Sequence, residues 1–216
     1  MWTRRRAVAL GVLTVSGLSG CGGAAELATG SGPIERTASP AILAEAAVSD
    51  TAYELSSREE QVLRREVSAG GETRTIVATN QIARYEKALN GVGRGSQFVV
   101  LSTPGFSFAG QPLNPIADWT NEELLQSVEP AFGDLSAVRE RATRTEPMLG
   151  TETTVSKFDA TATAGGQAFD LSLYTASVVN EGDVVIGAGG YPQAVDSGEA
   201  GTVEGFFSAI DHPTDR

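Results

Sequence analysis

The sequence is poor in the residues that build most catalytic and metal sites: its 216 residues include one cysteine, Cys21, and one histidine, His212. One cysteine cannot form a disulfide within the chain, and the two residues together are too few for a cysteine–histidine zinc site. Lysine is also rare, with only Lys87 and Lys157, and the formal net charge is −11. Because phosphate binding needs clustered lysine and arginine, we expect no nucleic-acid partner and little attraction to anionic lipid headgroups. We also expect no metal site and no soluble cofactor.

A long apolar run is absent as well. Residues 7–18 are apolar, but crossing a hydrocarbon core of roughly 30 Å needs about 20 such residues. They follow Arg4, Arg5 and Arg6, and a positive segment before a short apolar one is typical of a cleaved signal peptide. We expect residues 1–20 to be removed. The alternatives are an ordinary secreted protein with an incidental cysteine, and an uncleaved N-terminal helix.

Two details of this segment predict a lipid anchor. The pair Arg4-Arg5 after Thr3 resembles a twin-arginine export signal. The stretch Leu18-Ser19-Gly20-Cys21 resembles a lipobox, a resemblance that implies lipid on the Cys21 thiol and cleavage just before it. A single acyl chain binds a membrane only marginally, at about 0.8 kcal/mol per methylene, so stable anchoring requires two chains. We expect the protein to be held on the extracellular face of the cell membrane by lipid at Cys21.

The charge balance indicates a habitat. Loss of the three N-terminal arginines would make the mature chain three units more negative than −11. Such a charge opposes compactness by self-repulsion, and concentrated salt relieves it because the Debye length falls to about 3 Å at 1 M. An acidic, lysine-poor composition is similar to that of halophilic archaeal proteins. The alternative is an acidic surface protein from a mesophile.

The remaining chain divides simply. Residues 21–33 carry the lipidated cysteine and are rich in Gly, Ala and Ser, a composition typical of a flexible tether. Residues 34–211 have the length of a single domain, and residues 212–216 are expected to form a tail.

Periodicity predicts the elements of this domain. Ser39-Pro40 is expected to begin a first helix, with Ile42 and Leu43 on its apolar stripe. A two-residue period then predicts strands and hairpins, and capping-box spacing at Thr120 and Glu123 predicts a second helix. The expected strands are residues 53–69, 73–85, 97–104, 135–145, the 153–179 hairpin and 183–188. Val203, Phe206, Phe207 and Ile210 are expected on a last helix.

This order predicts an α+β fold: a largely antiparallel sheet of about seven strands with two or three packed helices. By analogy of element order it is similar to the PsbP-like fold. Several stretches together resemble a family of haloarchaeal twin-arginine-exported lipoproteins with no established function. They are the N-terminal signals, "ARYEKAL" (83–89), "LSTPGFSFAGQPLNP" (101–115), "LGTETTVSKFDA" (149–160) and "GGYPQAVD" (189–196). The resemblance implies an exported, anchored single domain and brings no activity.

Candidate catalytic groups are few. His212 lies near the C-terminus beyond the last expected helix, so we expect a solvated tail residue rather than a catalytic base, which needs a partner and a cleft. Acidic residues around Glu122 are better explained by the helix dipole than by a metal. Arginines at 139, 141 and 144 alternate with acids and indicate a solvated strand face.

The glycine-rich stretch 187–190 follows a strand but does not fit a dinucleotide-binding loop, since residue 192 is proline. Close backbone approach or a tight turn explains it better. Tyr191 and Pro192 are candidates for a binding surface, with a place in the core as the alternative.

The function expected from these observations is a non-enzymatic binding or assembly module on the outer face of the membrane, with an envelope protein as its partner. We expect no catalytic residue. The alternative is a carboxylate-dependent extracellular hydrolase, which needs two acids facing one cleft. A third possibility is a structural component of the envelope.

Overall fold

The computed structural model describes residues 32–69, 72–88, 95–105, 107–108, 111–112, 114–164 and 166–214. One compact unit begins at Pro33. The expected signal peptide, with Arg4 and Arg5, and the lipobox residues Leu18, Ser19, Gly20 and Cys21 lie outside the described residues. Within the part that is described, no helix has the length and apolar character needed to cross a bilayer.

Eight strands of the described chain form one sheet, in the order β1-β4-β5-β11-β10-β9-β8, and β3 lies outside β4. All pairs are antiparallel except β1 with β4. The strands are β1 (Ile34–Thr37), β3 (Glu54–Ala69), β4 (Glu72–Lys87), β5 (Ser96–Pro104), β8 (Asp134–Met148), β9 (Thr151–Ala164), β10 (Gln167–Asn180) and β11 (Asp183–Pro192). The α+β class and the largely antiparallel sheet are confirmed, and the PsbP-like analogy stays a prediction.

Both hairpins expected at glycine pairs are present. Ala69 lies opposite Glu72 in the β3–β4 pair, and Ala164 lies opposite Gln167 in the β9–β10 pair. The second turn includes Gly166 with φ of 78°, a conformation that glycine adopts without steric cost. The glycine pairs in the sequence therefore marked the positions of both turns.

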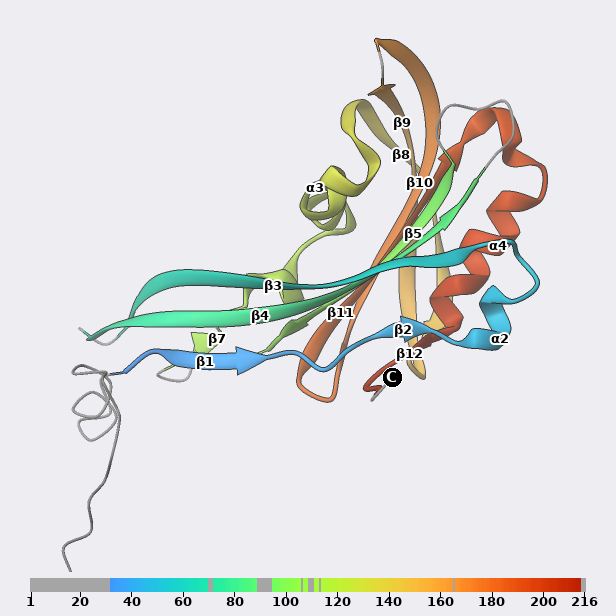
Figure 1. Cartoon of the computed structure of the whole chain (residues 1–216). Helices are drawn as coiled ribbons and strands as arrows, with labels where there is room; N and C mark the ends of the chain where they lie inside the picture. Colours follow the sequence, from blue (N-terminus) through green and yellow to red (C-terminus); the bar gives the residue numbers. More distant parts are fainter. Residues whose placement is uncertain are drawn as a thin grey trace, which may run out of the picture. The chain divides into compact units, whose positions relative to one another are not determined.

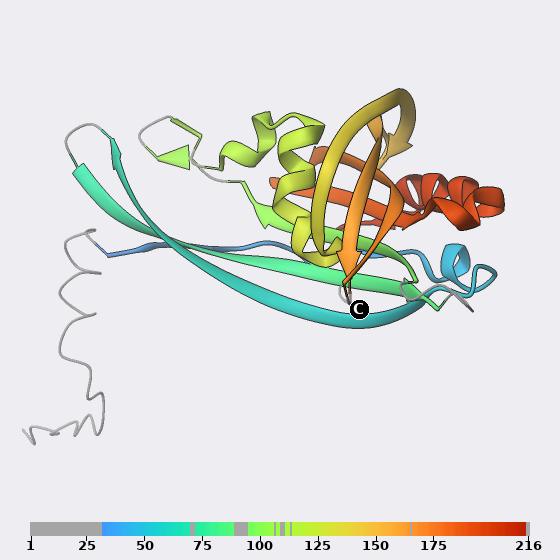
Figure 2. The same cartoon turned by 90° about the horizontal axis from the view of Figure 1, so that it is seen from above.

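Helices cover both faces of the sheet. Alternate residues of a strand point to opposite faces, and β11 uses both: Ile186 packs in a cluster with Leu124, while Val185 packs in another with Phe206. Leu124 belongs to α3 (Asn121–Phe132) and Phe206 to α4 (Asp196–Ser208), so the two helices lie on opposite faces (Figures 1 and 2). Short segments complete the body: α2 (Glu45–Val48), η1 (Pro115–Asp118), η2 (Gln193–Val195), β6 (Ser107–Phe108) and β7 (Gln111–Pro112).

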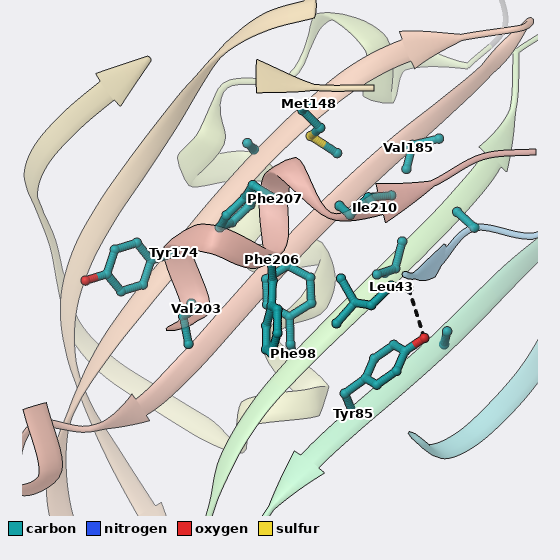
Figure 3. Packing of buried hydrophobic residues seen from close by; sticks show 14 of the residues in the cluster. Leu43, Tyr85, Phe98, Met148, Tyr174, Val185, Val203, Phe206, Phe207 and Ile210 are labelled. Atoms are coloured by element: carbon teal, nitrogen blue, oxygen red, sulfur yellow. Dashed lines mark hydrogen bonds between the residues drawn. The ribbon is translucent and has the colours of Figure 1, made fainter. Parts of the chain in front are cut away.

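The core beneath α4 is aromatic. Figure 3 shows Phe98 of β5 against Phe206 and Phe207, with ring centroids 5.2 and 5.3 Å apart and the rings nearly perpendicular. Such edge-to-face pairs add about 0.5–1.5 kcal/mol each beyond burial. At the rim of this cluster, the Leu43 backbone N–H donates to Tyr85 Oη over 2.9 Å.

The glycines of β11 let the helices approach the sheet. A Cβ on Gly189 would lie 2.4 Å from Val203 Cγ1 on α4, and a Cβ on Gly190 would lie 2.6 Å from Leu173 Cδ2 on the opposite face. Both distances are far inside van der Waals contact. The interpretation of this stretch as a close backbone approach, rather than a phosphate loop, is confirmed.

The first expected helix is wrong. Ile42 and Leu43 form a short strand, β2, that pairs antiparallel with β12 (Ile210–Asp211), and α2 follows with only four residues. Ile210, expected on the last helix, belongs to β12 instead. The pairing is long-range and buries Ile42, Leu43 and Ile210 together in the α4 core, and this outweighs the weak local helix signal.

Candidate functional site

The most concentrated polar group in the described body surrounds His212. Its side chain is 0% exposed, so the expectation of a solvated tail residue is wrong. Nδ1 lies 2.9 Å from Asn180 Oδ1, and Nε2 lies 3.2 Å from Asp183 Oδ2. Ser102 Oγ is 3.4 Å from the same Nε2, and the Ser39 backbone N–H donates to Asp183 Oδ2 over 2.7 Å. We name these five residues the His212 cluster.

Distant parts of the chain build the His212 cluster. Asn180 ends β10 and Asp183 begins β11, so the β10–β11 turn presents an amide and a carboxylate side by side. His212 arrives from the C-terminal segment directly after β12, and the Ser39 N–H arrives from the N-terminal segment before β2. The carboxylate of Asp183 thus holds both ends of the folded body.

The residue types serine, histidine and aspartate invite comparison with a catalytic triad. In a triad the carboxylate accepts from Nδ1, and Nε2 faces the serine. Here Asp183 and Ser102 share Nε2, while Asn180 occupies Nδ1. Ser102 is itself fully buried, so no substrate reaches its hydroxyl. The arrangement is that of a structural clasp, in which both ring nitrogens of His212 are bonded to side chains of the fold.

A second buried polar group centres on Glu199 of α4. Its carboxylate forms an ion pair with Lys87 Nζ and accepts a hydrogen bond of 3.1 Å from Tyr53 Oη. Lys87 Nζ also lies 5.7 Å from the centre of the Tyr53 ring. Burial raises the pKa of the Tyr53 hydroxyl well above its ordinary value, with a smaller contribution from the Glu199 charge. The three groups satisfy one another, which a buried charge requires.

The candidate binding surface at Tyr191 is wrong. Tyr191 is 0% exposed, and its hydroxyl lies 3.0 Å from that of Tyr174. Pro192 is buried beside it at the end of β11. Since β11 is buried along its whole length, the alternative interpretation, a place in the core, is the one that holds.

Surface clefts lie away from these clusters. One of about 300 Å³ lies between α3 and β8, near Leu125 and Val138. Another of about 240 Å³ is lined by Glu45, Asp211 and Arg58 among others. Both carboxylates belong to exposed residues, whereas the acid of a glycosidase is typically set in an apolar pocket. Among the described residues, no three His, Cys, Asp or Glu side chains gather closely enough to hold a metal ion.

Glu123, in the first turn of α3, forms a helix cap with Thr120. The Thr120 N–H donates to Glu123 Oε2 over 2.8 Å, and the Glu123 N–H donates back to Thr120 Oγ1 over 3.3 Å. The bond from the Thr120 backbone is the main cause that lowers the pKa of Glu123. The capping box predicted from spacing is confirmed. The arginines of β8 are exposed as expected, and Arg144 bridges Glu146 and Glu204.

Sequence reasoning missed the His212 cluster. Its members lie between residues 39 and 212, and the bonded pair Ser39 and Asp183 is 144 residues apart in the chain, so no local spacing reveals them. One signal was available: Ile210 and His212 are two residues apart, and a strand through them places both side chains on one face. The assignment of Ile210 to a helix concealed this alternation.

Comparisons with known proteins give a family and no activity. The family described as "Domain of unknown function (DUF6517)" matches residues 40–211. No curated protein matches the chain. A crystal structure of PA94 from Pseudomonas aeruginosa, a protein of unknown function suggested to be a regulator, is 17% identical with a TM-score of 0.39. That match covers 70% of this chain and 99% of the other.

Proposed function

Taking as premise that the chain belongs to the family of the domain of unknown function DUF6517, we propose that it is a lipid-anchored, non-enzymatic binding or assembly module on the extracellular face of the cell membrane. One observation carries the proposal. Arg4 and Arg5, a short apolar run and Leu18-Ser19-Gly20 precede the sole cysteine, and the folded body starts shortly after it, at Pro33. Twin-arginine export and a halophilic archaeal source are part of the same proposal.

Strand β1 is the first element of the body after the proposed tether. Ile34, the first residue of β1, pairs with Ile76, close to the tip of the β3–β4 hairpin. The tether between Cys21 and Pro33 spans at most about 43 Å when fully extended. A lipid on Cys21 would therefore keep the start of the body within about this distance of the membrane.

The internal chemistry of the body supports a non-enzymatic role. Both buried polar groups, around His212 and Glu199, use their hydrogen-bonding capacity on neighbours in the fold. A catalytic acid or base must instead face a substrate. The hydrolase remains the second candidate, and the cleft that contains Glu45 and Asp211 is the observation in its favour.

Cell fractionation of the full chain tests the anchor. The wild-type protein should be found with membranes, and mass spectrometry should show an N-terminus at residue 21 carrying lipid. Cys21→Ser should be released or left unprocessed, while Ser19→Ala, which keeps a small residue in the lipobox, should behave as wild type. Replacing Arg4 and Arg5 by lysine should stall export.

Two results would contradict the proposal. A Cys21→Ser protein that fractionates with membranes as wild type does would remove the anchor. Turnover of a surface polymer that is lost in Glu45→Gln and Asp211→Asn variants would favour the hydrolase instead.

A further inference from the structure

The outermost strand of the sheet, β3, has a free edge in the described structure. This strand of 16 residues pairs only with β4 there, and Figure 2 shows it as the outermost strand. The pairing runs in unbroken register from Ser57 to Ala69. All residues from Arg58 to Glu66 are exposed, including Val62 and Leu63, whose exposed fractions are 53% and 47%. A long, regular and partly apolar edge is a template for another strand.

The opposite edge of the sheet is different. Strand β8 contains two register shifts, between Ser136 and Arg139 and between Glu140 and Ala142. It also contains Pro147, which cannot donate a ladder hydrogen bond. Bulges and proline are the usual devices that prevent pairing at an edge. One edge of this sheet is thus protected, and the other is left regular.

The charges on β3 are arranged so that the strand complements itself. Around Val62, residues at equal distances in the two directions carry opposite charges. Position by position, Glu60 is matched by Arg64, Glu59 by Arg65, and Arg58 by Glu66; Gln61 and Leu63 are the uncharged positions next to the centre. When two copies of β3 lie antiparallel with Val62 opposite Val62, all six charges of each strand face a charge of the other sign.

We propose that the free edge of β3 binds a second copy of this chain through antiparallel pairing centred on Val62. Such an interface has two-fold symmetry and joins the two sheets into one. Directly opposite side chains lie about 4.5–5.5 Å apart, the range in which cross-strand pairs interact. Within one chain, Glu59 contacts Arg84 and Glu60 contacts Gln81, both residues of β4, and Arg58 also has a contact within the chain. The backbone groups along the outer edge of β3 are those that the second strand would bind.

This inference adds a partner to the assembly role proposed above, and it does not depend on the anchor. Its test therefore uses the full-length chain carrying Cys21→Ser. If that protein dimerises but the wild type is not anchored, only the proposed function fails. If the wild type is anchored but the protein is monomeric, only this inference fails.

A disulfide at the symmetry axis tests the register. In the Cys21→Ser chain, Val62→Cys introduces the sole thiol, and the two copies of residue 62 would have Cα atoms about 4.5–5.5 Å apart, within disulfide range. Mild oxidation should give a covalent dimer in high yield. The matched control is Val67→Cys on the same strand, whose two copies would lie ten residues apart along the pair, about 33 Å. Equal yields for the two variants, or a maximum at another position of β3, would overturn the proposal.

Reversing the sign of charges on β3 tests pairing between two chains separately from the folding of one chain. Glu59→Arg with Glu60→Arg places arginine opposite arginine, and Arg64→Glu with Arg65→Glu places glutamate opposite glutamate. Each variant alone should self-associate at least about tenfold more weakly than wild type. A mixture of the two should form heterodimers, because every changed pair then has opposite charges. Light scattering that shows a monomeric Cys21→Ser protein with β3 unchanged, or a mixture no more associated than its components, would overturn the proposal.

Discussion

The His212 cluster makes a sharp prediction for Asp183→Asn. The substitution keeps the size and shape of the side chain and removes its negative charge. In the wild type, Asp183 Oδ2 accepts two hydrogen bonds, from the Ser39 N–H at 2.7 Å and from His212 Nε2 at 3.2 Å. The side chain of His212 is 0% exposed, and the hydrogen bond from Ser39 is partly buried.

The expected loss follows from these two bonds. A hydrogen bond to a charged group contributes about 1.5–3 kcal/mol, and one between neutral groups contributes about 1. The amide oxygen of asparagine can still accept, so each of the two bonds weakens by about 1 kcal/mol. We expect the free energy of unfolding to fall by about 2 kcal/mol, out of a typical total of about 5–15.

Urea unfolding of the full-length chain measures this loss as a lower transition midpoint at an unchanged slope. The matched control is Asp170→Asn on β10, where an exposed carboxylate accepts from Thr161 Oγ1 over 3.1 Å. It should cost less than about 0.5 kcal/mol. Hydrogen exchange adds a local readout: Asp183→Asn should speed exchange in residues 38–44 and 209–214, and leave the β9–β10 pair protected.

Two outcomes would refute the clasp. Equal losses for Asp183→Asn and Asp170→Asn would show that the carboxylate carries no special share of stability. Faster exchange spread evenly over the sheet, with no excess in the two terminal segments, would show that Asp183 does not hold the ends of the body.

Two further predictions concern packing and alkaline pH. Gly189→Ala should lower the free energy of unfolding by about 1–3 kcal/mol, because its Cβ would lie 2.4 Å from a side-chain carbon of α4. Gly201→Ala, with nothing within 4 Å of its Cβ, should instead stabilise α4 by about 0.5–1 kcal/mol in the same urea assay. Burial raises the pKa values of Tyr53 and Tyr85 above the ordinary 10.0, so each tyrosine holds its proton longer in the folded state. Their contribution is complete below about pH 10 and declines above it, by up to about 1.4 kcal/mol per pH unit per tyrosine; Tyr53→Phe should reduce this slope, and equal slopes for variant and wild type would contradict the assignment.

Local signals predicted the elements whose formation is local. The β3–β4 hairpin followed from a glycine pair between two alternating runs, and the start of α3 followed from Thr120 and Glu123, which form the capping box. In both places the residues that decide the structure are within a few positions of one another. The register of the second hairpin was equally accessible, because its turn includes a glycine at positive φ.

Long-range pairing decided what the sequence concealed. Ile42 and Leu43 form a strand because residues near the C-terminus lie beside them, not because of their neighbours in the chain. The same pairing carries His212 to Asp183. Tyr191 shows the reverse error: an aromatic residue after glycines resembles a surface site, but helix α4 and the sheet enclose it in the core.

The charges of β3 show how topology changes the meaning of a pattern. In the sequence, Arg58 to Glu66 is a charged strand, and a charged strand is usually a solvated face. In a central strand, the same run would pair with strands of its own sheet on both edges. The order of its charges would then have to complement those neighbouring strands. In the described fold β3 has a partner on one edge only, so the order of charges along the other edge is available to a second molecule. The opposite charges at equal distances from Val62 therefore indicate pairing with a second molecule only because β3 is the outermost strand of the described sheet.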